Sequence, residues 1–98
     1  MIVLLVDQLG QIVATPGALV ALAAADTSPS TLLSRHASGD WGDLDAHDRA
    51  ANDAALRDGS RLLSAYIVAE AVKVWIITEA ADDDGLRAAT TLLLPEEY

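Results

Sequence analysis

Cysteine is absent from all 98 residues of the sequence. The chain can therefore form no disulfide, use no thiolate in catalysis and offer no cysteine ligand to zinc or to an iron–sulfur cluster. A chain without cysteine also fits a reducing compartment. Together with the absence of a targeting pattern described below, this predicts a cytoplasmic protein.

Basic residues are scarce as well. Six Lys and Arg residues stand against 15 Asp and Glu residues, which gives a formal net charge of −9. Phosphate contacts need cations, so the charge predicts no direct nucleic-acid binding, and an anionic membrane surface would repel the chain. The charge suits a protein partner with a basic surface, or it simply keeps a small protein soluble.

Long apolar runs and nucleotide-binding motifs are also missing. Asp7, Gly10 and Pro16 interrupt the apolar N-terminal part, and no basic segment precedes it. This pattern argues against a signal peptide and a transmembrane helix. The chain has no glycine-rich phosphate loop, no dinucleotide fingerprint and no nucleophile elbow. The sequence therefore predicts a protein without a cofactor, and it favours a non-enzymatic one.

The residue pattern predicts a single α+β domain. Thr15 and Ser28 each precede a proline and Asp45 precedes an alanine-rich segment, which are typical helix starts, and Gly59 is a typical helix end. We expect about three helices packed on a small antiparallel sheet, built from an N-terminal strand or hairpin and a C-terminal three-stranded meander. Trp75, in the middle of a predicted strand, should be at least half buried. The domain spans residues 1–98, with strands at residues 2–6, 11–14, 62–69, 72–78 and 88–94 and helices at residues 16–25, 29–36 and 46–58.

The segment RHASGDWGD, which begins at Arg35, is typical of a structural corner. Two glycines flank Trp41 and let the backbone bend on both sides of the ring, so we expect the ring to pack inward between the second and third helices. Asp40 or Asp43 should accept hydrogen bonds from backbone amides or from Arg35. His36 should lie near the corner and bond to a carboxylate or a carbonyl.

Charges of alternating sign recur every four residues on the third predicted helix. They favour a ladder of ion pairs on a solvated face. The opposite face consists of alanines, whose small side chains let a helix approach a sheet closely. The ladder residues are Asp45, Arg49, Asp53 and Arg57, and the alanines are Ala50, Ala51, Ala54 and Ala55.

Two histidines and nearby carboxylates are of the types that bind metal ions. His36 and His47, with Asp40 and Asp43, could ligate a transition metal. Their spacing matches no zinc motif, and the aspartates lack the glycine and the terminal glutamate of a calcium loop. The sequence therefore predicts no metal site.

A hydrolytic site is a second possibility. General acid–base chemistry needs only two positioned groups. If the protein is an enzyme, the residues that we expect to act are His36, Glu79, Tyr66 and Arg87. In the structural alternative, Tyr66 packs on the sheet and Glu79 pairs with Arg87 across a hairpin.

Several segments resemble a family of small uncharacterised bacterial proteins from mobile and accessory DNA, loosely labelled plasmid-related. The most specific are R-H-x-x-G-D-W-G-D, from Arg35 to Asp43, and T-T-x-L-L-P-E-E-Y, at residues 90–98. The resemblance covers nearly the whole chain and implies no activity and no catalytic residue. The chain departs from the family pattern at residues 81–86, where ADDDGL precedes Arg87 and lengthens the turn.

The leading hypothesis is a small acidic interaction protein of mobile genetic elements that inhibits a host defence system, such as a restriction or CRISPR nuclease complex. Such nucleases have basic channels that an acidic protein can occupy. Two alternatives stay open: a toxin-like enzyme that cuts RNA or DNA with His36 and Glu79, and a structural or regulatory homodimer formed through an exposed sheet face. The expected binding residues are Asp82, Asp83 and Asp84, with Trp41 and the unpaired carboxylates of Asp40, Asp43 and Asp48.

Overall fold

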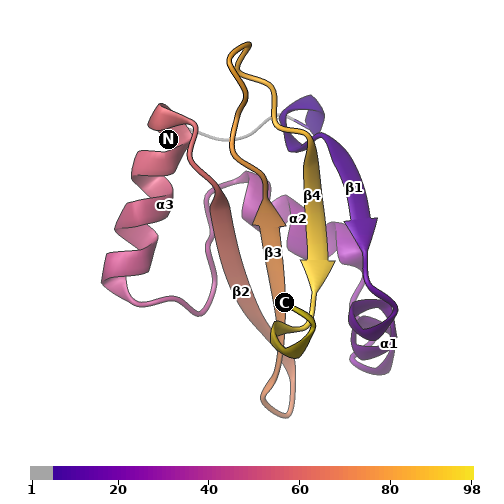
Figure 1. The fold of residues 1–98 in the computed structure, drawn as a ribbon. Helices are drawn as coiled ribbons and strands as arrows, with labels where there is room; N and C mark the ends of the chain where they lie inside the picture. The colour runs from indigo at the N-terminus through magenta and orange to yellow at the C-terminus, as the bar shows by residue number, and fades with distance from the viewer. Residues whose placement is uncertain (1–5) are drawn as a thin grey trace.

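The computed structural model describes residues 6–98, and these form the predicted α+β fold (Figure 1). One short strand precedes the three helices, and three strands follow them. The elements are the 3-10 helix η1 (Val6–Leu9), β1 (Gln11–Ala14), α1 (Pro16–Ala24), α2 (Pro29–Ala37), α3 (Ala46–Asp58), β2 (Leu62–Ala69), β3 (Val72–Thr78), β4 (Ala89–Leu93) and the 3-10 helix η2 (Pro95–Glu97).

The four strands form one sheet in the order β1-β4-β3-β2. The meander of β2, β3 and β4 is antiparallel, as predicted. β1 joins β4 in parallel, with Ile12 opposite Thr90, so the sheet is mixed. The helices between β1 and the meander provide the long connection that parallel pairing needs. The strand predicted at residues 2–6 lies outside the described residues except for Val6, which belongs to η1.

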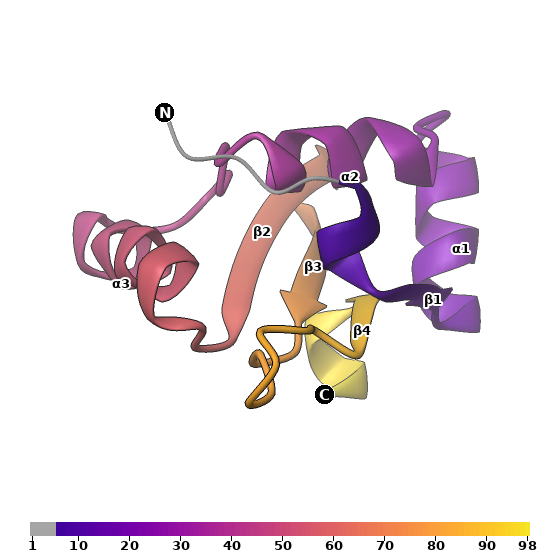
Figure 2. The same cartoon turned by 90° about the horizontal axis from the view of Figure 1, so that it is seen from above.

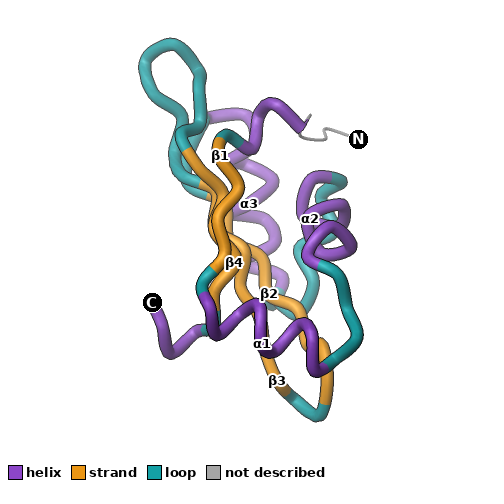
Figure 3. The backbone as a smooth tube through the Cα atoms, turned by 90° about the vertical axis from the view of Figure 1, so that its right-hand side faces the viewer, coloured by secondary structure: helices purple, strands orange, loops and turns teal. Residues whose placement is uncertain are grey.

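The helices leave one face of the sheet largely open (Figures 2 and 3). α2 lies over the other face, α3 lies beside β2, and α1 lies beyond the end of β1. η2 and the C-terminus lie on the open side. The main core lies between the sheet and the helices, and a second cluster lies near α3. The main core contains Ala18, Leu22, Leu32, Tyr66, Val74, Ile76 and Leu92, and the second cluster contains Leu9, Trp41, Ala55 and Leu62.

Local sequence signals place the three helix starts where they were predicted. The side chains of Thr15, Ser28 and Asp45 each accept a hydrogen bond from the backbone amide three residues later. Such a cap contributes about 1 kcal/mol to helix stability. Gly59 ends α3 with a φ of 83°, in the left-handed region that favours glycine.

The ion-pair ladder predicted on α3 is wrong. Neither of the two ion pairs found among residues 6–98 involves a residue of α3. The carboxylate of Asp53 instead accepts a hydrogen bond from the indole nitrogen of Trp41, at 3.0 Å. A buried indole N–H requires an acceptor, whereas an exposed ion pair contributes only a few tenths of a kcal/mol.

The face of α3 that meets the sheet also differs from the prediction. Ala55 is buried, but Ala50 and Ala51 are exposed. The buried face includes Asn52, which is 5% exposed. Periodicity missed this residue because a polar side chain is ordinarily assigned to the solvated face.

Trp75 is more than half buried, as predicted. Its neighbours Val74 and Ile76 are in the main core, so strand alternation puts Trp75 on the open face of the sheet. There its ring meets that of Tyr98 edge to face, with the ring centroids 5.8 Å apart. The open face is therefore partly covered at this point by the C-terminal residue.

Candidate functional site

Arg35 and Asp40 fasten the corner that follows α2. The Arg35 guanidinium donates to both carboxylate oxygens of Asp40, at 2.6 and 3.3 Å, and the Gly42 amide donates to the same carboxylate at 3.2 Å. The hydrogen bond from Arg35 is the main cause that lowers the pKa of Asp40. The Tyr66 hydroxyl donates to the Asp40 carbonyl at 2.8 Å. The prediction that a carboxylate fastens this corner is confirmed.

Trp41 is a core residue, as predicted. Its side chain is 3% exposed and packs with Ala55 of α3 and Leu62 of β2. Its ring meets His36 of α2 edge to face, at a centroid distance of 5.6 Å. Because the ring is buried, Trp41 cannot act as a surface contact in this conformation, although it was among the expected binding residues.

The outer edge of β2 is covered by four residues from two segments, which we call the β2 edge cover: Trp41, Gly42, Asp43 and Asn52. The Ala65 amide donates to the Trp41 carbonyl at 3.2 Å, and the Asp43 amide donates to the Ala65 carbonyl at 2.6 Å. The Asn52 side-chain amide donates to the Leu63 carbonyl at 2.6 Å and accepts from the Leu63 amide at 3.1 Å. The corner therefore satisfies backbone groups that an edge strand would otherwise expose.

The structure explains why the second glycine of the motif, Gly42, is a glycine. Its φ is 75°, and a Cβ at this position would collide with the Ala65 carbonyl and the Tyr66 ring. Another residue would therefore both strain the backbone and push the edge cover away from β2.

Replacing Asn52 by leucine should lower the free energy of unfolding by about 2–3 kcal/mol. The new side chain would remove two part-buried hydrogen bonds and leave the Leu63 N–H and C=O without their protein partners. Chemical denaturation monitored by circular dichroism would measure the loss. Ala51→Leu is the matched control, because Ala51 is an exposed neighbour on the same helix. Equal losses in both variants would contradict a role for the Asn52 amide.

His36 is fully buried and bonds to hydroxyl groups, so the prediction of a carboxylate or carbonyl partner is wrong. Its Nδ1 lies 2.6 Å from Ser64 Oγ, and its Nε2 lies 2.8 Å from Thr78 Oγ1. Thr78 Oγ1 lies 2.8 Å from Thr90 Oγ1, which donates to the Leu9 carbonyl at 2.6 Å. The His36 side chain thus joins α2 directly to β2 and β3, and through the two threonines it also reaches β4 and η1.

The donor and acceptor roles along this series of hydrogen bonds determine the tautomer of His36. The Thr90 hydroxyl proton goes to a carbonyl, which can only accept, so Thr78 must donate to Thr90. Thr78 then accepts from His36 Nε2–H, which leaves Nδ1 to accept from Ser64. Burial, and secondly the positive charge of Arg87, lower the pKa of His36 to about 4. The imidazole is therefore neutral at physiological pH.

The four residues expected for a hydrolytic site do not assemble into one. His36 has both ring nitrogens occupied in the core, and burial raises the pKa of Tyr66 to about 12. Thr78 points to the helix side and bonds to His36, so strand alternation puts the exposed Glu79 on the opposite side. Arg87 donates to the backbone carbonyl of Glu79, at 3.0 Å, and not to its carboxylate.

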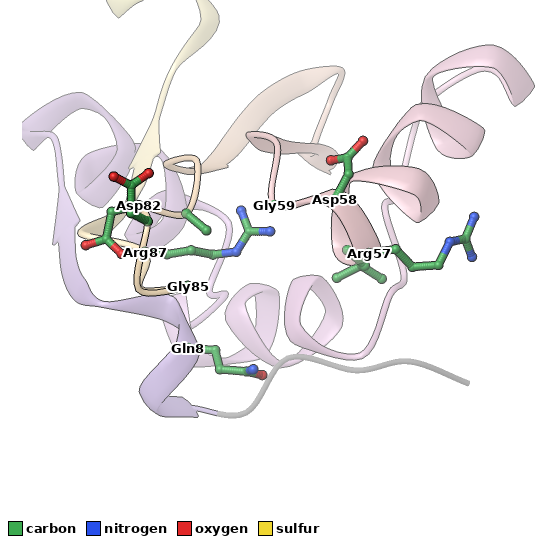
Figure 4. Close-up of a pocket in the computed structure, with 10 residues that line it drawn as sticks. Gln8, Arg57, Asp58, Gly59, Asp82, Gly85 and Arg87 are labelled. Atoms are coloured by element: carbon green, nitrogen blue, oxygen red, sulfur yellow. The ribbon is translucent and has the colours of Figure 1, made fainter.

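A polar pocket of about 360 Å³ lies where the end of α3 meets the loop between β3 and β4 (Figure 4). The Arg87 guanidinium caps the C-terminal end of α3: it donates to the carbonyls of Ala55, Ser60 and Glu79, at 3.1, 2.8 and 3.0 Å. Burial lowers the pKa of Arg87, and the charge of Asp58 opposes this shift. The residues lining the pocket are Gln8, Leu56, Arg57, Asp58, Gly59, Ala81, Asp82, Asp83, Gly85 and Arg87.

The structure separates the predicted binding aspartates into two groups. Asp40 is paired with Arg35, and Asp43 lies 3.2 Å from the Lys73 ammonium, so the expectation that these two are unpaired is wrong. The other four are exposed on α3 or on the loop between β3 and β4 and form none of the ion pairs found among residues 6–98. This second group consists of Asp48, Asp82, Asp83 and Asp84.

Comparisons with family models, with curated proteins and with solved structures found no match to this chain. Within residues 6–98, no cluster of three or more histidine and acidic side chains is arranged to hold a metal ion. None of the helices in this part of the chain is long and apolar enough to cross a membrane.

Proposed function

We propose that this protein is a small acidic, non-enzymatic interaction protein that binds a basic surface of a macromolecular partner through the loop between β3 and β4. The observation that carries the proposal is the distribution of charge around the polar pocket. Carboxylates of Asp58, Asp82 and Asp83 line it, whereas the Arg87 guanidinium is held by backbone carbonyls. Arg57 extends away from Arg87 (Figure 4).

The loop is preformed by one of its own carboxylates. Asp82 Oδ1 accepts hydrogen bonds from the backbone amides of Asp84 and Leu86, both at 2.9 Å. The side chains of Asp83 and Asp84 are exposed beside it. A loop that is already ordered loses less conformational entropy on binding than a flexible one, which favours its use as a contact surface.

The partner that we propose is a nuclease or effector complex of a host defence system, such as restriction or CRISPR machinery. The negative charge supports this class because nucleic-acid channels are basic, and charge complementarity accelerates and orients association. The resemblance to proteins of mobile DNA supports it independently. Asp82, Asp83 and Asp84 are the proposed contacts, whereas the paired carboxylates of Asp40 and Asp43 belong to the fold.

Capture from a host lysate at low salt, followed by titration against each identified partner, tests this function. Asp83→Asn combined with Asp84→Asn should weaken binding about tenfold or more and reduce its salt dependence. Glu70→Gln combined with Glu96→Gln is the matched control, because it changes the net charge equally at exposed positions elsewhere. Recovery of no nuclease, effector complex or other macromolecule would contradict the proposal, as would equal weakening by the control.

A further inference from the structure

The two edge strands of the sheet, β2 and β1, differ in whether other residues cover their outer backbone groups. The outer edge of β2 is closed by the β2 edge cover, whereas β1 forms the other edge. The Gln11 amide donates to the carbonyl of Ala88, just before β4, and the Thr15 amide donates to that of Leu92 in β4, both at 3.0 Å. Strand alternation therefore directs the N–H and C=O groups of Ile12 and Ala14 away from β4. β1 contains none of the lysine, proline or bulge devices that usually protect such an edge.

The chain segment that contains β1 and α1 has no charged side chain of its own and exposes apolar ones. Residues 11–25 contain no charged side chain, in a chain with 15 acidic and six basic residues. Within this stretch Ile12 is 43% exposed and Val13 39% exposed, and on α1 Val20 is 70% exposed. An apolar groove of about 250 Å³ between β1 and α2, lined by Leu9, Ile12, Ser30, Leu33, Ser34 and Ala37, continues this surface. Charge depletion with exposed apolar residues is typical of the centre of a protein interface.

We propose that β1 pairs antiparallel with β1 of a second copy of this chain, across a two-fold axis at Val13. The backbone N–H and C=O of Ile12 would bond to the C=O and N–H of Ala14 in the other copy. The same pair of bonds forms between Ala14 and the Ile12 of the other copy, which gives four backbone hydrogen bonds in all. Each Ile12 side chain would lie opposite the small side chain of Ala14. The two sheets would join into one continuous sheet whose outer strands are the two copies of β2.

Charge directs a second copy to this segment and away from the rest of the surface. Two molecules of net charge −9 repel each other, so they can approach closely only where their surfaces carry no charge. Two carboxylates border this stretch: Asp26 follows it directly in sequence, and Glu97 accepts hydrogen bonds from Thr15 and Leu94. The edge is also self-complementary, as a two-fold interface requires. The pairing uses β1 and not the loop between β3 and β4, so this inference does not rest on the proposed function.

Disulfide trapping tests the geometry directly. In the proposed register Val13 faces Val13 of the other copy as a non-hydrogen-bonded pair, with Cα atoms about 4.5 Å apart, which suits a disulfide. The chain contains no cysteine, so Val13→Cys introduces a single thiol. Mild oxidation should convert most of this variant to a covalent dimer. Ile67→Cys is the matched control, because Ile67 is 55% exposed on β2, and it should remain monomeric.

Sedimentation of the unmodified chain provides the second measurement. It should behave as a dimer of twice the 10.3 kDa chain mass, and Val13→Lys should raise the dissociation constant about 100-fold by placing like charges opposite each other. Circular dichroism checks that the variant is folded; if it is not, Ile12→Lys, at the second exposed apolar position of β1, takes its place. A monomeric wild-type chain, including one that binds another protein at β1, overturns the proposal. Equal cross-linking of the two cysteine variants also overturns it.

Discussion

Replacing Trp41 by alanine should lower the free energy of unfolding by about 3–5 kcal/mol, the largest effect that we expect from a single substitution. The ring is 3% exposed and packs between α2, α3 and β2, and its indole nitrogen donates to Asp53. Alanine would leave a cavity at the junction of these elements. A domain of this size holds only about 5–15 kcal/mol, so the melting temperature should fall by more than about 10 °C.

Trp75→Ala is the matched control for Trp41→Ala. Trp75 is only partly buried and lies on the open sheet face. Its replacement should therefore lower the free energy of unfolding clearly less than that of Trp41. Thermal melting of both variants beside the wild type measures the difference. An unchanged melting temperature for Trp41→Ala, together with loss of partner binding, would show that the corner is a functional surface and not a structural one.

Stability should decrease by about 3 kcal/mol as the pH falls from 6.5 to 4, through protonation of His36. Burial lowers the pKa of His36 from its ordinary value of 6.5 to about 4. Below pH 6.5 the unfolded chain binds a proton that the folded chain does not bind until about pH 4. The stability is therefore fully present above pH 6.5 and is lost across this window, at about 1.4 kcal/mol per pH unit.

Denaturant unfolding at several pH values measures this loss. His36→Gln removes the titrating group and should flatten the curve between pH 6.5 and 4, whatever its effect on stability at neutral pH. His47→Gln, which removes the exposed histidine of α3, is the matched control. Trp41 fluorescence gives a second signal, because its ring contacts that of His36. Identical slopes for the wild type and His36→Gln would show that His36 is not neutral in the folded state.

Short-range signals made much of the fold predictable. The caps at Thr15, Ser28 and Asp45 act on amides three residues away, so the sequence alone locates these helix starts. Alternation with period two locates the three C-terminal strands because it describes which residues share a face of one strand. The corner at Asp40 was predictable for the same reason, since its partners Arg35 and Gly42 are close in sequence.

The site depended on contacts between distant residues. Asn52 and Leu63 meet because α3 lies beside β2, and no periodicity distinguishes this asparagine from a solvated one. His36 finds its hydroxyl partners on β2 and β3, so a search for nearby carboxylates or carbonyls chose the wrong atoms. Asp53 was assigned to an ion pair on its own helix because the indole N–H of Trp41 reaches it only after folding.

Neighbouring residues and composition are enough to predict the class of the fold, the starts of the three helices, the three C-terminal strands and the strong negative charge. Folding decides that β1 runs parallel to β4. Within residues 6–98 it also decides that part of the β2 edge is covered while the β1 edge is not, and which aspartates form ion pairs. The physical reason is that strand pairing and buried hydrogen bonds join segments far apart in sequence. Their partners are selected by what must be satisfied once water is excluded.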